Sequence, residues 1–335
     1  MSYETGLSKI GLAFLSDQYE PDAIVKLAVK AERNRAGAVW LAEHYCSTDV
    51  FSVLGALAVN TSRIKLGTSI VSPFIRHPMT VATASATIAS LSGGRFILGV
   101  GAGFQRWVED YLGLPYKPVL SRMAESVNLI RGVLSGDGCD FQGRWFRARN
   151  SKITPKPPKY RIPLYLGAVG DKMKSLAFQV ADGLILSAGS SLDYVMKTCE
   201  ELQRRKVSKR FEIVVLTFIS INRNSQAAKN ALKPEIATIL SRPGRAERML
   251  ASHKLDPEWF AELRKSVENQ DRDKIRKLIT DDMVDQLAAA GTADETLEYL
   301  SRLTKLKAVS IALVPIKNDM KAVFKLVRRA SEQTL

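Results

Sequence analysis

The stretch "IKLGTSIVSPFIRHPMTVATASATIASLSGGRFILGVG" (residues 64–101) predicts one strand–helix–strand unit of a parallel sheet. Residues 64–71 and 95–101 are short runs rich in Val, Ile and Leu, and residues 78–92 between them have helical periodicity. Pro78 stands at the first helical position, where its missing N–H costs nothing. Strands of a parallel sheet are covered on both faces and are therefore almost wholly apolar. The unit predicts an α/β protein.

The same alternation of strand and helix recurs along the chain. Further strands are predicted at 9–15, 38–42, 162–168, 183–188, 211–220 and 308–315. Further helices are predicted at 21–36, 49–61, 121–134, 171–181, 191–206 and 317–332. Eight strands separated by helices in 335 residues favour a (β/α)8 barrel over an open doubly wound sheet. We therefore predict a single TIM-barrel domain over residues 1–335, with its function at the C-terminal ends of the strands.

Two segments interrupt the alternation and are predicted as insertions. Near 138–150, "CDFQGRWFRARN" has a Gln-Gly turn between two alternating runs, which is typical of a β-hairpin. Residues near 225–300 are mainly helical in pattern. Thr292 and Glu295 within them have the spacing of a capping box.

The composition is that of an ordinary soluble enzyme, with 46% hydrophobic and 25% charged residues. No run approaches the roughly 18 apolar residues that a membrane span requires, and the N-terminus has no signal pattern. We expect a cytoplasmic protein without a membrane partner. The cysteines and the histidines number three each and are widely spaced, so we expect neither a disulfide framework nor a metal site.

The formal net charge is +15, from 49 Lys and Arg against 34 Asp and Glu. Such a charge indicates a nucleic acid, an acidic ligand or merely a basic proteome. The basic residues are spread along the chain, and the densest runs, 204–210 and 325–330, adjoin predicted helices whose solvated faces would carry them. Because no basic patch interleaved with aromatics and no DNA-reading motif is present, we expect no nucleic-acid partner.

Small residues follow several of the predicted strands. The segments are 99–107 ("GVGAGFQRW"), 167–172 ("GAVGDK") and 187–191 ("SAGSS"). Such loops let the backbone approach a phosphate or a flat ring closely. Each also has a simpler interpretation, because glycine after a strand often only makes a turn. Asp171 is predicted to cap its helix, and the serines of 187–191 to cap the next.

Two ionisable residues follow the second strand. His44 either holds a ring in place and moves a proton near neutral pH, or is a satisfied structural histidine. Glu43 is either an acid or the partner in a local ion pair. His77 stands directly before Pro78 and is predicted to be a helix cap.

Six stretches carry a resemblance to a known family. They are "WLAEHY" (40–45), "IKLGTSIVSPFIRHPMTVA" (64–82), "ASLSGGRFILGVGAG" (89–103), "PLYLGAVGDKM" (163–173), "ADGLILSAGSS" (181–191) and "ITDDMVDQLAAAGTADE" (279–295). With these stretches the chain resembles the bacterial-luciferase-like superfamily of flavin- and deazaflavin-dependent oxidoreductases. Within it, the chain is most similar to the coenzyme F420-dependent branch and its methylenetetrahydromethanopterin reductases.

The resemblance implies a TIM barrel whose third strand carries a bulge with a cis peptide bond, here Ser69–Ile70, against which the tricyclic ring rests. It implies catalytic roles for Glu43 and His44, with His44 at the edge of the ring. The cofactor-binding residues that it implies are His44, Ser69, Ile70, Gly101, Gly103, Ala168, Val169, Gly170 and Ser187.

The implied reaction is hydride transfer between C5 of the deazaflavin and a carbon of a small-molecule substrate, in the reductases a pterin of one-carbon metabolism. The alternative within the superfamily is an FMN-dependent monooxygenase. The resemblance also implies a homodimer or a higher homo-oligomer.

This chain departs from the methylenetetrahydromethanopterin reductases at three positions. It has Ala13 and Phe104 where they carry acidic residues, and Glu43 where they carry Asp. Three interpretations stay open: Glu43 serves as the acid in this chain, the substrate needs no acid from the protein, or the apolar Ala13 and Phe104 shape a pocket for a different substrate.

Overall fold

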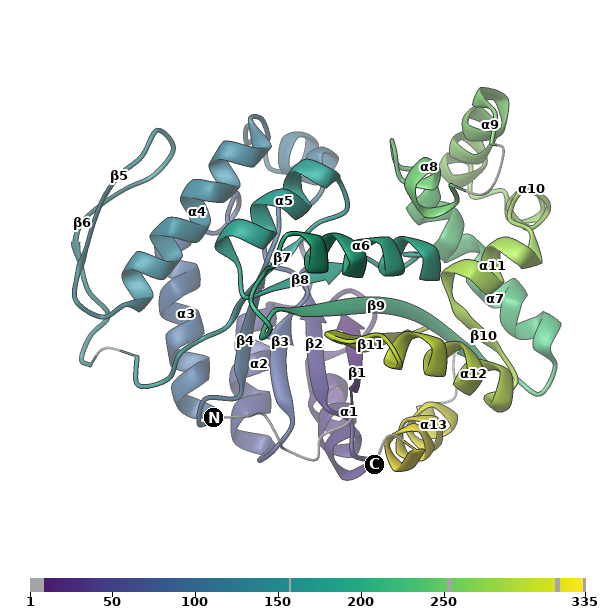
Figure 1. The fold of residues 1–335 in the computed structure, drawn as a ribbon, viewed down its shortest axis with the longest axis horizontal. Helices are drawn as coiled ribbons and strands as arrows, with labels where there is room; N and C mark the ends of the chain where they lie inside the picture. The colour runs from purple at the N-terminus through teal and green to yellow at the C-terminus, as the bar shows by residue number, and fades with distance from the viewer. Residues whose placement is uncertain (1–8, 157, 252–254, 317–319, 334–335) are drawn as a thin grey trace.

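The computed structural model shows a closed barrel of eight parallel strands (Figure 1). It describes residues 9–156, 158–251, 255–316 and 320–333. The barrel strands are β1 (Ile10–Leu15), β2 (Ala38–Ala42), β3 (Lys65–Thr68), β4 (Phe96–Val100), β7 (Leu164–Gly167), β8 (Gly183–Leu186), β9 (Glu212–Ile221) and β11 (Val309–Pro315). Each strand pairs with the next in this order, and β11 closes the barrel against β1. The predicted TIM barrel is confirmed.

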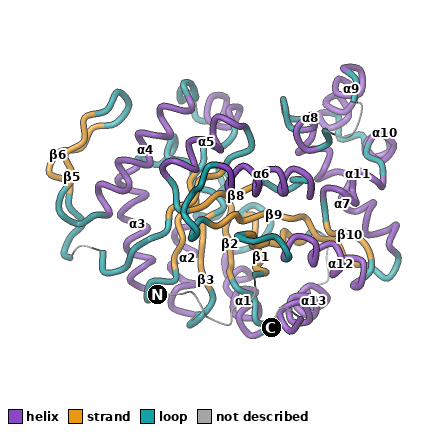
Figure 2. Tube along the Cα trace, in the orientation of Figure 1, coloured by secondary structure: helices purple, strands orange, loops and turns teal. Residues whose placement is uncertain are grey.

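The helices surround the strands, as Figure 2 shows. The helices around the barrel are α1 (Pro21–Arg33), α2 (Val50–Asn60), α3 (Pro78–Leu91), α4 (Val119–Leu134), α5 (Asp171–Val180), α6 (Leu192–Arg204), α12 (Ala293–Thr304) and α13 (Met320–Gln333). Each buries one stripe against the sheet; in α1, for example, the fully buried residues Ile24, Ala28 and Ala31 recur at helical spacing. Within the described residues, none of the helices combines the length and the apolar character that crossing a bilayer requires.

Close packing between neighbouring strands explains two glycines of the opening stretch. Trp40 of β2 lies in register with Gly67 of β3, and a Cβ on Gly67 would come within 2.4 Å of the indole. A Cβ on Gly99 of β4 would lie 2.0 Å from the carbonyl oxygen of Thr68. Any side chain at these positions would therefore push the strands apart.

Further elements lie at the two ends of the long axis in Figure 1. The hairpin of β5 (Cys139–Gln142) and β6 (Arg147–Ser151) packs beside α4. At the other end are α7 (Ser225–Leu240), α8 (Ala246–Met249), α9 (Pro257–Glu268), α10 (Arg272–Leu278) and α11 (Asp281–Leu287). The capping box of Thr292 and Glu295 is present at the start of α12. A short strand that we did not predict, β10 (Ala289–Gly291), pairs with β9 outside the barrel.

Several predicted boundaries differ from the structure. The helix predicted at 21–36 ends at Arg33, because Asn34 caps it and Arg35 takes a φ of 62°, which turns the chain. The strand predicted at 64–71 leaves the sheet after Thr68, and only an isolated bridge at Val71 rejoins it. Of the helix predicted at 317–332, residues 317–319 lie outside the described residues.

Helix caps follow the predictions at two positions and contradict one. His77 Nδ1 accepts from the backbone N–H of Met79 at 3.3 Å, and Ser191 caps α6. Asp171, in contrast, is the first residue of α5 and not its cap; Gly170 holds that position and provides no side chain. The carboxylate of Asp171 instead lies 3.1 Å from Lys174 Nζ.

Arg95, at the start of β4, links three elements at the N-terminal end of the barrel. Its guanidinium donates to the carbonyl oxygens of Ala58, Thr61, Ile64 and Ser92 and to the Thr61 hydroxyl, at 2.7–2.9 Å. Burial lowers the pKa of Arg95, and the nearby Glu32 carboxylate opposes that shift. The guanidinium thus satisfies carbonyls at the ends of α2 and α3 that water reaches poorly.

Replacing Arg95 with Gln is expected to lower the free energy of unfolding by about 3 kcal/mol, because several buried carbonyls lose their donors. Urea denaturation measures this change. The matched control is the exposed Arg223, whose replacement with Gln should change stability by less than about 0.5 kcal/mol. Equal effects of the two substitutions would contradict the proposed role of Arg95.

Candidate active site

The C-terminal ends of β2, β3 and β4 meet around a bulge at Ser69 and Ile70. The peptide bond between these two residues is cis, as the resemblance implied. The Ser69 N–H donates to the carbonyl of Leu41 at 2.7 Å, and the Ile70 carbonyl accepts from the N–H of Glu43 at 3.3 Å. On the other side the N–H of Val71 donates to the Gly99 carbonyl at 3.1 Å. Backbone bonds to both neighbouring strands therefore hold the bulge in position.

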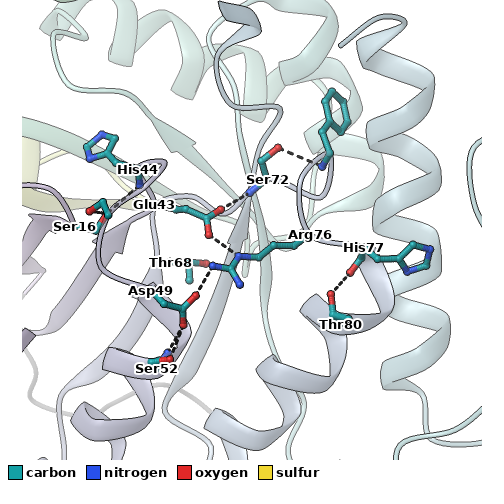
Figure 3. Close-up of polar contacts among 12 residues, drawn as sticks. Ser16, Glu43, His44, Asp49, Ser52, Thr68, Ser72, Arg76, His77 and Thr80 are labelled. Carbon is teal, nitrogen blue, oxygen red and sulfur yellow. Dashed lines mark hydrogen bonds and ion pairs between the residues drawn. The ribbon is translucent and has the colours of Figure 1, made fainter. Parts of the chain in front are cut away.

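Glu43, directly after β2, is part of a network of charged side chains (Figure 3). Its Oε1 accepts from Arg76 Nε at 2.5 Å, and its Oε2 accepts from the N–H of Ser72 at 3.2 Å. Arg76 also donates through Nη2 to Asp49, the N-cap of α2. These contacts agree with the interpretation of Glu43 as the partner in a local ion pair. The role of Glu43 as an acid remains a prediction.

The pKa values in this network show which charges are fixed. Burial lowers the pKa of Arg76, but the carboxylates of Glu43 and Asp49 raise it, and the net shift is upward. Burial raises the pKa of Asp49, whereas the Ser52 backbone and hydroxyl and the Arg76 guanidinium lower it, for a net decrease. Arg76 and Asp49 are thus both charged at neutral pH and attract each other.

His44 lies apart from this network although it follows Glu43 in the sequence. Figure 3 shows the His44 ring and the Glu43 carboxylate pointing in different directions from the end of β2. The His44 backbone N–H donates to Ser16 Oγ at 2.9 Å, and Nδ1 lies 2.8 Å from Asp17 Oδ1. Nδ1 is buried and, within the described residues, makes no hydrogen bond of good geometry, although it lies close to the Asp17 carboxylate.

An aromatic cluster covers His44 and was not predicted. Trp107, on the π-helical turn η1 (Trp107–Tyr111), contacts the His44 ring edge-on with centroids 5.2 Å apart. Tyr45 and Phe104 contact the same indole at 4.9 and 4.7 Å. Burial raises the pKa of Tyr45 far above its usual value of 10, and the charge of Glu43 raises it further. The Tyr45 phenol is therefore a neutral hydrogen-bond donor near His44.

The glycines at the ends of β4 and β7 allow close packing at two different places. Gly103 takes a φ of 72°, and a Cβ there would approach the Tyr45 hydroxyl to 3.0 Å. Gly101 is buried, and a Cβ there would lie 2.8 Å from Ile70 Cγ1. Gly167 approaches Ile70 from another side, at 3.0 Å from Cγ2. Gly101 and Gly167 thus make room for Ile70 beneath the bulge.

The remaining predicted residues follow β7 and β8. Ala168 is buried, and the carbonyl of Val169 accepts a hydrogen bond from the Tyr194 hydroxyl. Gly170 precedes α5 without a side-chain cap, so the first N–H groups of α5 have no side-chain acceptor there. Ser187 Oγ accepts from Arg245 Nη1. The structure therefore places these residues on the same end of the barrel as Ser69 and His44.

Two arginines between α7 and α8 also reach this end of the barrel and were not predicted. The guanidinium of Arg242 lies 3.7 Å from the centre of the Phe104 ring, and Arg245 binds Ser187. Burial lowers the pKa of Arg242 to about 10, and the charge of Arg245 adds to that decrease. Keeping the Arg242 guanidinium charged at neutral pH then costs the fold on the order of 3 kcal/mol.

Ala13 and Phe104 mark the departures from the resembled reductases. Ala13 is buried in β1, and Phe104 is partly buried between Trp107 and Arg242. No carboxylate therefore stands at either position in this structure. Among the described residues, no group of three His, Cys, Asp or Glu side chains is arranged to hold a metal ion.

Comparison with known proteins gives matches over most of the chain. The model of the luciferase-like monooxygenase family matches residues 8–308. The 5,10-methylenetetrahydromethanopterin reductase of Archaeoglobus fulgidus is 31% identical over 330 residues, which are 95% of this chain and 97% of the relative. The F420-dependent glucose-6-phosphate dehydrogenase of Nakamurella multipartita is 34% identical over 195 residues, 55% of this chain and 57% of the relative.

Among solved structures, the coenzyme F420-dependent tetrahydromethanopterin reductase of Methanopyrus kandleri is similar to this chain with a TM-score of 0.84. Its sequence is 26% identical, and the alignment covers 97% of this chain and 98% of that one. The likeness therefore includes the barrel and the segments inserted between its strands.

Proposed function

Because the chain belongs to the luciferase-like monooxygenase family, we propose that it is a coenzyme F420-dependent oxidoreductase that transfers a hydride between C5 of the deazaflavin and a substrate carbon. The predicted membership in the bacterial-luciferase-like superfamily is confirmed by the match over residues 8–308. The observation that carries the proposal is the similarity, over nearly the whole chain, to two reductases. One is named as a methylenetetrahydromethanopterin reductase, and the other as a coenzyme F420-dependent reductase.

The residues at the barrel end fit a flat ring with a phosphate-bearing tail. Ser69 Oγ is buried and has no hydrogen-bond partner in the part of the chain that the structure describes. Ile70 is partly exposed, with Gly101 packed against it. The uncapped N–H groups that follow Gly170 favour an anion, because they carry the positive end of the helix dipole. The first two features suit a ring and the third suits a phosphate.

When bound, coenzyme F420 supplies a carbon centre that carries a hydride, so the protein needs no nucleophile of its own. The chain's own residues then orient the reactants and exclude water. His44 presents its imidazole at the edge of the ring as a hydrogen-bonding or proton-transfer group, with the Asp17 carboxylate 2.8 Å from Nδ1. Trp107 covers His44, and Tyr45 donates from a phenol that stays neutral.

Glu43 has a different position in this mechanism. Its oxygens already bind Arg76 and the Ser72 N–H, and its side chain is 9% exposed. These contacts favour a positioning role, in which Glu43 fixes the loop after β3 and thereby the surface under the ring. Direct proton donation by Glu43 is the alternative.

We further propose a pterin substrate and a role in one-carbon metabolism, by analogy with the methylenetetrahydromethanopterin reductases. We propose that the protein works in the cytoplasm as a homodimer or a higher homo-oligomer, and that the whole chain forms one domain. The second candidate function is an FMN-dependent monooxygenase, which the description of the matched family favours.

Binding of the two cofactors distinguishes these candidates. Titration with F420 is expected to quench the tryptophan fluorescence, because Trp107 lies beside the proposed ring site, whereas FMN should produce no response. Trp107→Phe should remove most of the quenching, and Trp145→Phe, on the β5–β6 hairpin, should keep it. A response to FMN alone would contradict the F420 assignment.

Replacement of the two ionisable residues tests their roles in turnover. His44→Gln is expected to lower kcat by about 10²-fold, because it removes the proton-transfer group. Glu43→Gln should lower the melting temperature and raise KM for the cofactor, because the loop that Glu43 holds through Arg76 would lose its anchor. Its kcat should stay within about threefold of the unmodified protein, because a positioning residue does not take part in the chemical step. The assay follows oxidation of reduced F420 with methylene-tetrahydromethanopterin, methylene-tetrahydrofolate or simple carbonyls as substrates.

His77→Gln is the matched control, because His77 caps α3 and contacts Phe146 rather than any proposed site residue, and its kcat should equal that of the unmodified protein. If Glu43→Gln abolished turnover without affecting stability or cofactor binding, Glu43 would be the proton donor instead. Full activity of His44→Gln would remove His44 from the chemistry.

A further inference from the structure

The strongest unassigned feature is the pair of arginines between α7 and α8. Arg242 and Arg245 are partly buried, and they are one helical turn apart in the sequence. Within the described residues, no carboxylate pairs with either of them. Arg242 faces an aromatic ring, and Arg245 faces the neutral hydroxyl of Ser187. Two partly buried cations without an anionic partner are costly, so an anionic ligand would stabilise them.

The neighbours of Arg245 provide neutral hydroxyl groups and the further positive charges of Arg242 and Arg248. The charge of Arg245 acts on the phenols of Tyr116 and Tyr194, whose pKa values burial raises. The Tyr116 hydroxyl donates to the Gly103 carbonyl at 3.2 Å, and that of Tyr194 donates to Val169. Arg245 therefore lies between the loops that follow β4, β7 and β8, where a ligand in the barrel would meet it.

A chain of side-chain contacts connects Arg242 with His44. Arg242 covers Phe104, Phe104 contacts Trp107, and Trp107 contacts the ring of His44. Two aromatic side chains, Phe104 and Trp107, thus separate Arg242 from His44, the residue proposed at the edge of the deazaflavin. The N–H groups after Gly170 provide a separate location for the phosphate of the cofactor's tail.

We propose that Arg242 and Arg245 bind an anionic group of the substrate, a phosphate or a carboxylate, over the mouth of the barrel. The proposal rests on the proposed function, which places the cofactor's ring against Ser69 and Ile70. The substrate is then an acid whose charged group is held by the two arginines while its reacting carbon faces the ring. The guanidinium geometry suits both groups, because each can accept paired N–H donors.

Inorganic phosphate is the probe for this site. Isothermal titration calorimetry of phosphate into F420-loaded protein should show binding, and Arg242→Gln and Arg245→Gln should each weaken it by about tenfold. Arg223→Gln, a change at an exposed arginine before α7, should leave phosphate affinity unchanged. The F420 dissociation constant should stay within about twofold in every variant, because the site belongs to the substrate. Melting curves verify that each variant is folded. If Arg245→Gln does not fold, Arg245→Lys replaces it in the titration, because lysine retains the charge but lacks the paired donors of a guanidinium.

Two results would overturn the proposal. The first is phosphate binding that is absent from the unmodified holoprotein or insensitive to both glutamine substitutions. The second is loss of F420 affinity in these variants while a deazariboflavin without the phosphodiester tail binds normally, because the arginines would then hold the cofactor's tail.

Failure of the proposed function gives a different result. The unmodified protein would then not bind F420 at all. Phosphate titration of the ligand-free protein would in that case decide whether the arginines form an anion site, independently of the cofactor.

Discussion

The ion pairs of Arg76 with Glu43 and Asp49 are the contacts on which the rest of the site depends. The chain leaves the sheet after Thr68, and no regular element holds it until α3 begins at Pro78. Arg76 fixes this segment to the end of β2 through Glu43 and to the start of α2 through Asp49. A partly buried pair of this kind is costly to break, because the remaining charge would be left without a partner.

From this anchored loop the site extends in two directions across the end of the barrel. Toward β4, Ile70 packs on Gly101, and Gly103 two residues further on lies beside Tyr45 of the aromatic cluster. Toward β8, the loop at Ser187 meets Arg245. The barrel thus provides an apolar, shaped surface on one side and uncompensated positive charge on the other. This division suits a flat cofactor that carries the redox chemistry and an acidic substrate that approaches from the arginines.

The sequence predicted the barrel because each strand is a short apolar run and each helix has its own periodicity. It also placed His44, Ser69 and Ser187 at strand ends that the fold brings together. It did not reveal the contact of Arg242 with Phe104 or of Arg245 with Ser187, because these residues are more than 50 positions apart and no local pattern links them. The strand β10 was missed for a similar reason: three small residues become a strand only beside β9. Asp171 looked like a cap because the residue type is right, but it is itself the first residue of the helix and Gly170 holds the cap position.

The most direct test of this account is a crystal structure of the protein with bound F420. We expect density for the tricyclic ring against the Ser69–Ile70 peptide, with the edge of the ring at His44 and the Glu43–Arg76 pair intact. The phosphate of the tail should lie at the start of α5, with Arg242 and Arg245 left free for the substrate. A ring bound elsewhere, or turned away from His44, would contradict the central claim that the bulge after β3 is the cofactor's platform.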